Sequence, residues 1–490
     1  MSKLLEEFLA SNAAYPVMYR QLNQLIGSAA SLPPLTREPG APLRLLFAGY
    51  AGGGNTGSDV RVAEMMRQVR AILGRDKVVI GLVATGEELP PDLLDDVILE
   101  PVLDYFPDFL MQTIPRYDGV IACDGSMFKS NLCSMLSGML GGALGIAAAA
   151  GKLAVGYGAE AGKMDPDLSE FVAGLGRAPL VLCRNEESRA VLEPLGLRTT
   201  GGADTAWTYQ AEPAAATTER LRALRLEHRP LLVVCPMNPF WWPVSPDLRK
   251  AQELEQTGAH RELHFGSLLF HPDDETIRTR YATYLDALAF AAQQWQQESG
   301  GSVLIIGMDK VDRIACNDLA TRFEQTPPVV VSGDAPPAAM VGLLRAADLL
   351  LSSRFHAIVT SMEAGVPAVG VSMDERIANL LGKDEIGRRL LKVDAVDLPE
   401  RLVAALRHAE AERSQIHAQT RAAVVTQLRS MAEMGMRFAR EVQRFHPDLQ
   451  TPDEAGPWTA FLPSLSPQLE ELIELIAPHA IRAEASALSA

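Results

Sequence analysis

Cysteine is scarce in this chain, and no two cysteines have the C-x-x-C spacing of a metal or redox motif. The five that occur lie mostly in apolar runs, at Cys123, Cys133, Cys183, Cys235 and Cys316. Because disulfides are rare in reducing compartments, this pattern predicts buried free thiols and a cytoplasmic location. The start, MSKLLEEFLA, carries two glutamates before any apolar run and is therefore atypical of a signal peptide.

Positive charge is also in short supply. Lys and Arg number 45 against 61 Asp and Glu, which gives a formal net charge of −16. This balance argues against nucleic acid or an anionic membrane surface as the main partner. It does not exclude a small anion, because a local cluster of arginines can hold one.

Long runs of large apolar residues are missing too. The stretch LCSMLSGMLGGALGIAAAA, residues 132–150, is uncharged but consists mostly of Gly, Ala and Ser. Small side chains favour a buried helix packed closely on a sheet over a helix that spans a bilayer. We therefore predict no integral membrane span.

What the chain does contain is a series of short apolar runs that alternate with helical patterns. One series begins at LRLLFAGY (43–50), and a second begins at PLLVVCPMN (230–238). Such alternation predicts parallel sheets covered on both faces, and 490 residues are too many for one core. We predict an α/β fold with a helical arm, two similar lobes and a C-terminal helical extension, at 1–40, 41–225, 226–395 and 396–490.

An unusual segment, residues 239–273, interrupts the second lobe. It holds two of the five tryptophans and three of the nine histidines. One interpretation is a loop with its own small core, and the other is a lid or an acceptor-binding surface. The histidines are spaced by four and seven residues, without a cysteine or acid at ligand spacing, so we expect no metal.

The stretch AGYAGGGNTGSD, residues 48–59, matches G-x-G-x-x-G between a strand and a helix. A dinucleotide site would require an acid at the tip of the next strand, but that strand ends in Ala84, Thr85 and Gly86. A P-loop is excluded as well, because no Gly-Lys-Ser/Thr follows.

The glycines of this turn permit a ligand to approach the backbone, at Gly53 and Gly54, beside the positive end of the following helix. Asn55 lies at the same helix end and is a candidate for substrate binding. Asp59 either caps the helix or accepts a proton from a substrate hydroxyl.

The segment AADLLLSSRFHAIVTSMEAGVPAVGVSMDERIANLL, residues 346–381, places Arg354 and His356 at a strand-to-helix turn. Ligands of open parallel sheets sit at such turns, where Arg suits a carboxylate or phosphate and His can exchange a proton. Arg184 follows another strand, and Asp124 and Ser126 lie at a further strand tip. Alternatively, Arg184 is a surface arginine and the CDGS segment a plain turn.

These blocks resemble the polysaccharide pyruvyl transferase family. GYAGGGNTGSD is similar to the first turn of that family, and ADLLLSSRFHAIVTSMEAGVPAVGVSMDERI is similar to its C-terminal motif. YGAEAG, LCRNEESRAVLEPLG and GGADTAW follow in the family's order, so the resemblance spans 43–395. The sequence departs from the pattern at Ser58, which interrupts the usual Gly-Asp, at Arg376 in place of lysine, and in CDGSMF in place of three glycines.

The resemblance implies two Rossmann-like lobes facing across a cleft, as in GT-B glycosyltransferases. It also implies transfer of a pyruvyl group from phosphoenolpyruvate to two hydroxyls of a free or lipid-linked saccharide, giving a cyclic ketal. Phosphoenolpyruvate is then a donor substrate and no resident cofactor is needed. A lipid-linked acceptor would bring the protein to the inner face of the membrane.

The resemblance maps the family's arginines onto Arg354 and Arg184 and its histidine onto His356, and the chemistry of the implied reaction then suggests roles for the candidate residues. Arg354 and Arg184, with Arg376 behind them, would bind the anionic donor, and His356 would protonate its methylene carbon. Asp59 or Asp124 would accept a hydroxyl proton, and Ser126 would bind substrate.

Two alternatives remain open at this point. The first is a glycosyltransferase that uses a nucleotide sugar, in which Glu363, seven residues after His356, would hold the ribose hydroxyls. The second is a relative that has kept the fold and lost the reaction.

Overall fold

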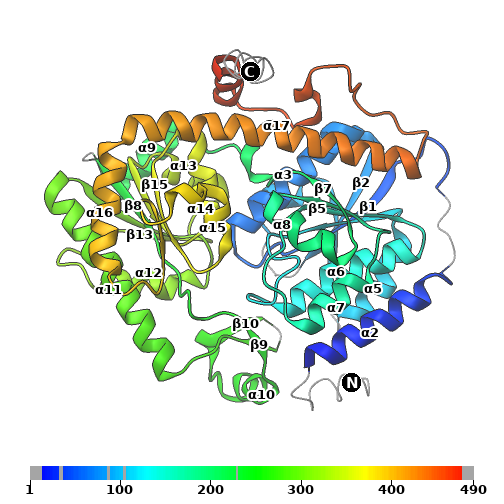
Figure 1. The fold of residues 1–490 in the computed structure, drawn as a ribbon, viewed down its shortest axis with the longest axis horizontal. Helices are drawn as coiled ribbons and strands as arrows, with labels where there is room; N and C mark the ends of the chain where they lie inside the picture. Colours follow the sequence, from blue (N-terminus) through cyan, green and yellow to red (C-terminus); the bar gives the residue numbers. More distant parts are fainter. Residues whose placement is uncertain are drawn as a thin grey trace.

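The computed structural model describes residues 14–32, 37–84, 89–102, 106–227, 230–266 and 268–476. Parts of the predicted arm (1–13 and 33–36), Thr85 and Gly86, and the end of the C-terminal extension (477–490) lie outside the described residues. Two α/β lobes stand side by side, with the described N-terminal helix under the first and the C-terminal helices above both (Figure 1).

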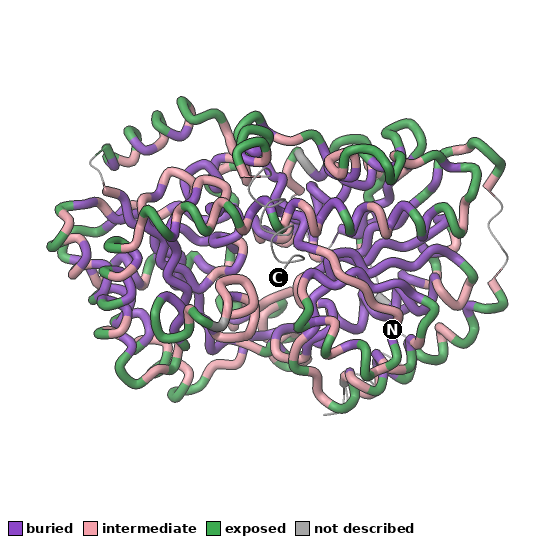
Figure 2. Tube along the Cα trace, turned by 45° about the horizontal axis from the view of Figure 1, so that its top comes forward, coloured by how far each residue is buried: buried purple, intermediate pink, exposed green. Residues whose placement is uncertain are grey.

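The first lobe is built on a seven-stranded parallel sheet in the order β3-β2-β1-β4-β5-β6-β7. Its central strands are buried along their whole length, which explains why they read as continuous apolar runs (Figure 2). The strands are β1 (Leu43–Gly49), β2 (Val78–Ala84), β3 (Val97–Pro101), β4 (Gly119–Cys123), β5 (Leu153–Ala159), β6 (Leu180–Cys183) and β7 (Arg198–Gly201). The helices between them are α3 (Thr56–Leu73), α4 (Pro91–Leu94), α5 (Phe106–Thr113), α6 (Ser134–Ala149), α7 (Pro166–Gly174) and α8 (Glu186–Leu192).

The second lobe repeats this plan with a six-stranded parallel sheet, β13-β12-β8-β14-β15-β16. Its strands are β8 (Leu231–Cys235), β12 (Ser302–Gly307), β13 (Val329–Val331), β14 (Leu349–Ser352), β15 (Ala368–Ser372) and β16 (Leu390–Lys392). Its helices include α11 (Glu275–Ser299), α12 (Asp312–Ala320), α13 (Pro337–Arg345), α14 (Phe355–Ser361) and α15 (Glu375–Leu381).

Both sheets have the Rossmann strand order. When the strands of each sheet are counted along the chain, they lie in the order 3-2-1-4-5-6, and the first sheet adds a seventh strand at the end. The order reverses between β1 and β4 in the first lobe and between β8 and β14 in the second. The predicted pair of Rossmann-like lobes in a GT-B-like arrangement is therefore confirmed. Ligands of such sheets bind beyond the carboxyl ends of the strands at the reversal point.

The uncharged stretch at 132–150 forms the buried helix that its composition predicts. Helix α6 packs on β4 and β5 and is covered by α2 (Ala14–Ala29) from the N-terminal arm. A Cβ at Gly142 would lie 2.7 Å from a methyl group of Leu22, so small residues let the two helices meet closely. In the described part of the chain, no helix combines the length and apolarity that a membrane crossing requires. All five cysteines are buried free thiols, as predicted.

The chain crosses between the lobes in two places. Helix α9 (Ala214–Ala223) already packs on α13 of the second lobe, so the first crossing precedes it, whereas the sequence suggests a boundary at 225. Helix α16 (Leu398–Ala411) covers the second sheet, and α17 (Arg413–Phe445) then runs back over both lobes to α3 and β5 (Figure 1). Periodicity alone does not show which sheet a helix covers, and this explains the difference at α9.

The Trp/His-rich insert forms a small antiparallel sheet in the order β10-β11-β9, with helix α10 (Leu248–Thr257). The strands are β9 (Ser245–Pro246), β10 (His264–Gly266) and β11 (Leu269–Phe270). Although it interrupts the second lobe, the insert reaches the first: the Val244 N–H donates to the Leu132 carbonyl at 3.0 Å. The Tyr15 hydroxyl of α2 also donates to the Val244 carbonyl at 3.1 Å.

Candidate functional site

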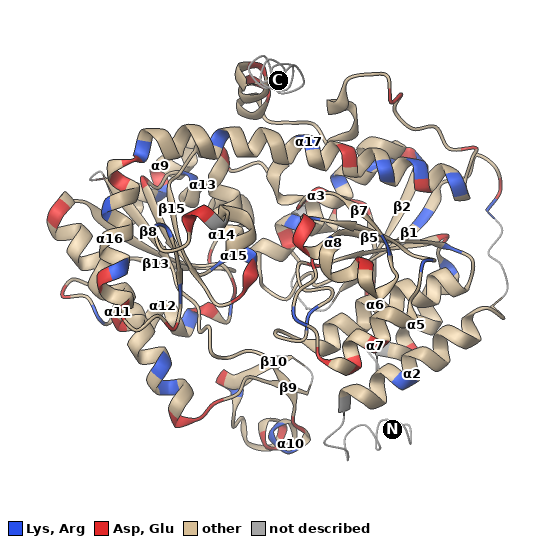
Figure 3. Cartoon of the chain, viewed as in Figure 1, with Lys and Arg blue, Asp and Glu red and all other residues tan. Residues whose placement is uncertain are grey.

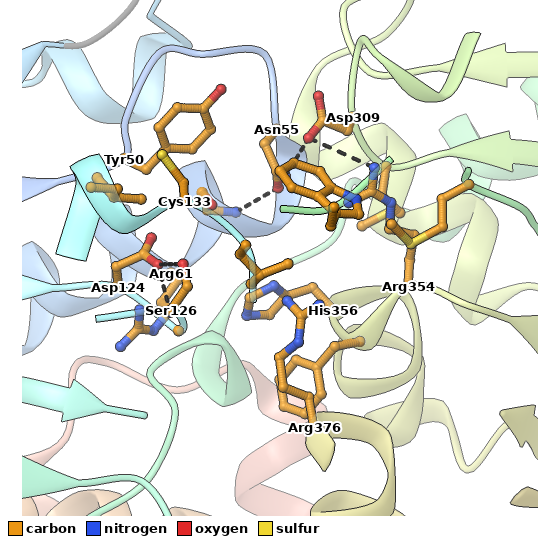
Figure 4. Close-up of a pocket in the computed structure, with 18 of the residues that line it drawn as sticks. Tyr50, Asn55, Arg61, Asp124, Ser126, Cys133, Asp309, Arg354, His356 and Arg376 are labelled. Atoms are coloured by element: carbon orange, nitrogen blue, oxygen red, sulfur yellow. Dashed lines mark hydrogen bonds and ion pairs between the residues drawn. The ribbon is translucent and has the colours of Figure 1, made fainter. Parts of the chain in front are cut away.

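A cavity lies between the lobes, where the reversal points of the two sheets face one another. It is lined by the turns after β1 and β4, the start of α6, the turns after β8, β12 and β14, and the insert (Figure 4). Both signs of charge occur where the lobes meet, close to α8 and α15 (Figure 3). Six predicted site residues line this cavity: Asn55, Asp124, Ser126, Arg354, His356 and Arg376.

The glycine-rich turn after β1 is bound to the second lobe. The Asn55 side chain donates from Nδ2 to Asp309 at 2.7 Å, and its Oδ1 accepts the Ser58 N–H at the start of α3. The Lys310 N–H donates to the Gly54 carbonyl at 2.9 Å, and Gly54 has a φ of 78°, which favours glycine. The close approach predicted here is thus made to the opposite lobe at Gly54 and to Tyr50 of the same turn at Gly53, and neither glycine lines the cavity.

A buried lysine joins the lobes on another side. Lys129, which follows β4, lies 2.7 Å from the Glu375 carboxylate at the start of α15 and 3.5 Å from Glu160. Burial lowers the pKa of Lys129 to about 8, although Asp374 and Glu375 oppose the shift. Together with the Asn55–Asp309 contact, this ion pair fixes the distance between the walls of the cavity.

His356 belongs to a buried cluster around Asp204. The Asp204 Oδ2 atom lies 3.0 Å from Nη1 of Arg184 and 3.4 Å from both Nε of Arg61 and Nε2 of His356. Burial lowers the pKa of His356 below its ordinary value, and the two arginines add to this shift while Asp204 opposes it. Burial by itself would raise the pKa of Asp204, but His356, Arg61 and Arg184 hold it well below its usual range.

Arg184 lies behind the cavity wall and does not line it. Its guanidinium pairs with Glu160 and Asp204 and stacks 4.2 Å from the centre of the Phe355 ring. A Cβ at Gly125 would lie 3.0 Å from its Nη1, so Gly125 and Phe355, which both line the cavity, pack directly against this arginine. Burial lowers the pKa of Arg184 to about 10.

Three other guanidinium groups do line the cavity, those of Arg61, Arg354 and Arg376. Each is held along one edge: Arg61 by the Tyr157 and Gly158 carbonyls, Arg354 by Asp312 and Arg376 by Asp374. Within the described residues, no protein oxygen accepts a hydrogen bond from Nη1 of these three arginines, because all their bonds use Nε or Nη2. Three oriented donor groups therefore remain for an anion in the cavity.

A family model for polysaccharide pyruvyl transferase matches residues 55–375, which is well over half of the chain. The chain belongs to the polysaccharide pyruvyl transferase family. No curated protein matches it significantly.

Several solved structures resemble this member of the pyruvyl transferase family over most of its length. HepE of Anabaena in complex with UDP-glucose is 13% identical and has a TM-score of 0.49, over 81% of this chain and 100% of that one. MnaA of S. aureus with UDP is 10% identical, with a TM-score of 0.49 over 85% and 100%. The E. coli ADP-heptose LPS heptosyltransferase II is 12% identical, with a TM-score of 0.34 over 77% and 99%. The assignment of the fold rests on the sheet topology and not on these likenesses.

The two candidate proton acceptors of the pyruvyl transferase reaction lie in different surroundings. Asp124 lines the cavity and accepts hydrogen bonds from the backbone N–H (2.6 Å) and the hydroxyl of Ser126. Asp59 does not line it; its Oδ1 accepts the Gly52 N–H at 2.9 Å and so holds the glycine-rich turn. Geometry favours Asp124, and the role of Asp59 as acceptor stays a prediction.

The raised pKa of Asp59 makes the stability of the folded protein depend on pH, and this tests how the Asp59 carboxyl group holds the glycine-rich turn. Burial raises its pKa from 3.8 to about 7, so the folded protein loses stability as pH rises between these values. Asp59→Asn keeps an acceptor for Gly52 and cannot ionise. We expect its melting temperature to match the wild type below pH 3.8 and to exceed it at pH 8, by the equivalent of about 1 kcal/mol or more. A lower melting temperature at pH 8 would mean that the turn requires the charge.

Glu363, the acid considered for a nucleotide ribose, lies away from the cavity. Its carboxylate pairs with Arg345 at 2.7 Å and accepts a hydrogen bond from Ser466 of the C-terminal segment. Both Arg345 and Ser466 therefore contact the Glu363 carboxylate within the folded chain. The role of Glu363 in substrate binding stays a prediction.

Several residues of the site were not predicted from the sequence. Asp309 and Asp312 follow the apolar run of β12, so the strand-tip reasoning that found Arg354 could have found them. Arg61 lies within a helical pattern and Asp204 in a loop after the half-buried β7. Arg61 carries no local signal that distinguishes it from an ordinary surface charge, whereas Asp204 lies in GGADTAW, a block of the family resemblance to which no role was assigned.

Proposed function

We propose that this protein transfers a pyruvyl group from phosphoenolpyruvate to two hydroxyls of a saccharide, forming a cyclic ketal. The observation that carries the proposal is the meeting of Arg61, Arg354, Arg376 and His356 in one cavity between the lobes. Phosphoenolpyruvate carries a carboxylate and a phosphate, and three guanidinium groups with a free edge suit two such anions. Family membership supports the same reaction class.

The reaction needs one proton delivered to carbon. Protonation of the methylene carbon by the His356 imidazolium leaves an electron-poor C2, which a saccharide hydroxyl attacks. The C2–O bond to phosphate then breaks and phosphate leaves with the bonding electrons. A second hydroxyl closes the ketal on C2, and Asp124 is placed to accept a hydroxyl proton. Of the two hydroxyl protons released, one replaces the proton that His356 gave to carbon and the other leaves with the phosphate. The pKa of His356 is lowered in the empty site, and the negative charge of the donor opposes this shift. Binding of the donor therefore favours the protonated imidazolium that the reaction requires.

The decisive experiment is incubation of the protein with phosphoenolpyruvate and a panel of glycans. We expect phosphate release that depends on the glycan, and a product heavier than the glycan by pyruvate less one water. A parallel incubation with UDP-sugars serves as the comparison. Release of UDP with glycosyl transfer would overturn the proposal in favour of a glycosyltransferase, and no turnover with any donor would favour a non-catalytic relative.

The position of His356 depends on Gly57, and this gives a second test. A Cβ at Gly57 would lie 2.5 Å from Nδ1 of His356, so Gly57→Ala displaces the imidazole. We expect kcat for pyruvyl transfer to fall by roughly 10²-fold, the cost of a misplacement near 1 Å. Gly27→Ala on α2 is the matched control, because nothing lies within 4 Å of its Cβ. Equal activity in both variants would show that the imidazole position is unimportant.

A further inference from the structure

Three aromatic side chains form part of the cavity lining. We define the aromatic wall as Tyr50, which follows β1, together with Trp242 and Phe265 of the insert; all three line the cavity and are half-buried. The Tyr50 and Phe265 rings lie 6.0 Å apart at 13°, and Trp242 meets Phe265 edge-on at 5.3 Å. Residues from both lobes are thus required to build it.

The side chains that pack around the wall are apolar or neutral. Cys133 and Leu136 of the first lobe pack with Trp242 and Phe265. The buried His271 ring meets Trp242 at 5.0 Å and Phe265 at 5.5 Å, and its Nδ1 is 2.9 Å from the Trp241 carbonyl. Burial lowers the pKa of His271 to about 4, so it is neutral at physiological pH. The wall therefore offers a rigid π surface without competing charge.

The rest of the lining is mixed, with Met237, Met308 and Phe355 beside a set of polar side chains. Asn55, Asp124, Ser126 and Asp309 belong to the same cavity and supply acceptors and donors for hydroxyl groups. A pyranose ring has the matching chemistry, with a face of weakly positive C–H groups that a π face attracts and a rim of hydroxyls. Because 6.0 Å between the Tyr50 and Phe265 rings admits no ring between them, a ligand ring would stack on the face of the wall that borders the cavity.

We propose that the aromatic wall is the acceptor subsite, where one pyranose ring of the saccharide stacks with its hydroxyls toward the polar lining. This inference rests on the proposed function for the identity of the second substrate. It also assigns a role to the insert, which brings Trp242 and Phe265 across to the first lobe and so completes the site.

Equilibrium binding without donor tests this subsite independently of turnover. The probe is methyl β-galactopyranoside, whose hydrogens at C3, C4 and C5 form one apolar face, and galactitol is the acyclic comparison. We expect saturation-transfer NMR to detect the pyranoside and not galactitol, and Trp242→Leu to weaken binding by about tenfold while Trp242→Phe retains most of it. Trp458→Ala is the matched control, because this half-buried tryptophan lies against Arg429, outside the cavity lining.

The outcomes separate the two proposals. Equal binding by wild type and a folded Trp242→Leu protein overturns the subsite, as does uridine binding more tightly than the pyranoside. If the insert fails to fold in that variant, Tyr50→Leu tests the wall from the first lobe, with the same tenfold loss expected. Binding of the pyranoside to the aromatic wall without any pyruvyl transfer would support the subsite and contradict the proposal that phosphoenolpyruvate is the donor.

Discussion

Replacing His356 with glutamine lowers kcat for pyruvyl transfer by about 10²–10⁴-fold, the usual contribution of a positioned general acid. Glutamine can still donate a hydrogen bond toward Asp204, 3.4 Å from the imidazole, but it cannot give up a proton to carbon. We therefore expect the melting temperature to stay close to that of the wild type. Steady-state phosphate release, with the melting temperature measured on the same samples, checks both parts.

A second readout separates acid catalysis from simple packing at His356. Because its pKa is lowered in the empty site, binding of the dianionic donor should be accompanied by uptake of a fraction of a proton near neutral pH. Calorimetry in buffers of different ionisation enthalpy measures this uptake, which the glutamine variant should lack. His408→Gln on α16 is the control. Full activity in His356→Gln would refute the assignment of the acid.

The largest effect on stability is expected from Asp204→Asn. Its buried carboxylate compensates Arg61, Arg184 and His356, so the substitution leaves buried positive charge with less compensation. Removing one partner of a buried ionic network costs about 3–5 kcal/mol, and a drop of several degrees in melting temperature should result. Activity should fall as well, because His356 loses the group that orients it.

The pH dependence of this effect has a definite sign. The folded state holds the pKa of Asp204 well below 3.8, so its contribution is present above that pH and is lost on acidification. The difference in melting temperature between wild type and Asp204→Asn should therefore shrink as pH falls below 3.8. Asp95→Asn, which removes one half of the exposed pair with Arg75, is the control and should change little. A melting temperature unchanged in Asp204→Asn would show that the cluster does not depend on this carboxylate.

Much of the fold could be predicted because fully buried parallel strands read as uninterrupted apolar runs. β4, β5 and β8 are buried at every position, and each stands out in the sequence for that reason. The small-residue helix α6 was recognisable in the same way. The site residues at strand tips, Arg354 and Asp124 among them, followed from the rule that the carboxyl ends of parallel strands share one edge.

The partners of these side chains could not be predicted. Arg354 was expected to be free for a ligand, but Asp312 occupies one edge of its guanidinium. Arg184 was expected in the cavity, but Glu160 and Asp204 hold it behind Gly125. Such pairings join residues far apart in the chain, and no local pattern records them.

The two parallel sheets, the edge at which the polar residues gather and the family could all be derived from the amino-acid sequence, because each depends on contiguous segments of fixed periodicity and spacing. The folded arrangement was needed to show which lobe the Trp/His-rich insert touches, which arginines face the cavity and which carboxylate holds His356. These outcomes depend on how the two lobes meet. That contact is the sum of many weak interactions between residues far apart in the chain, such as Asn55 with Asp309 and Lys129 with Glu375. The sequence around either residue of such a pair does not indicate its partner.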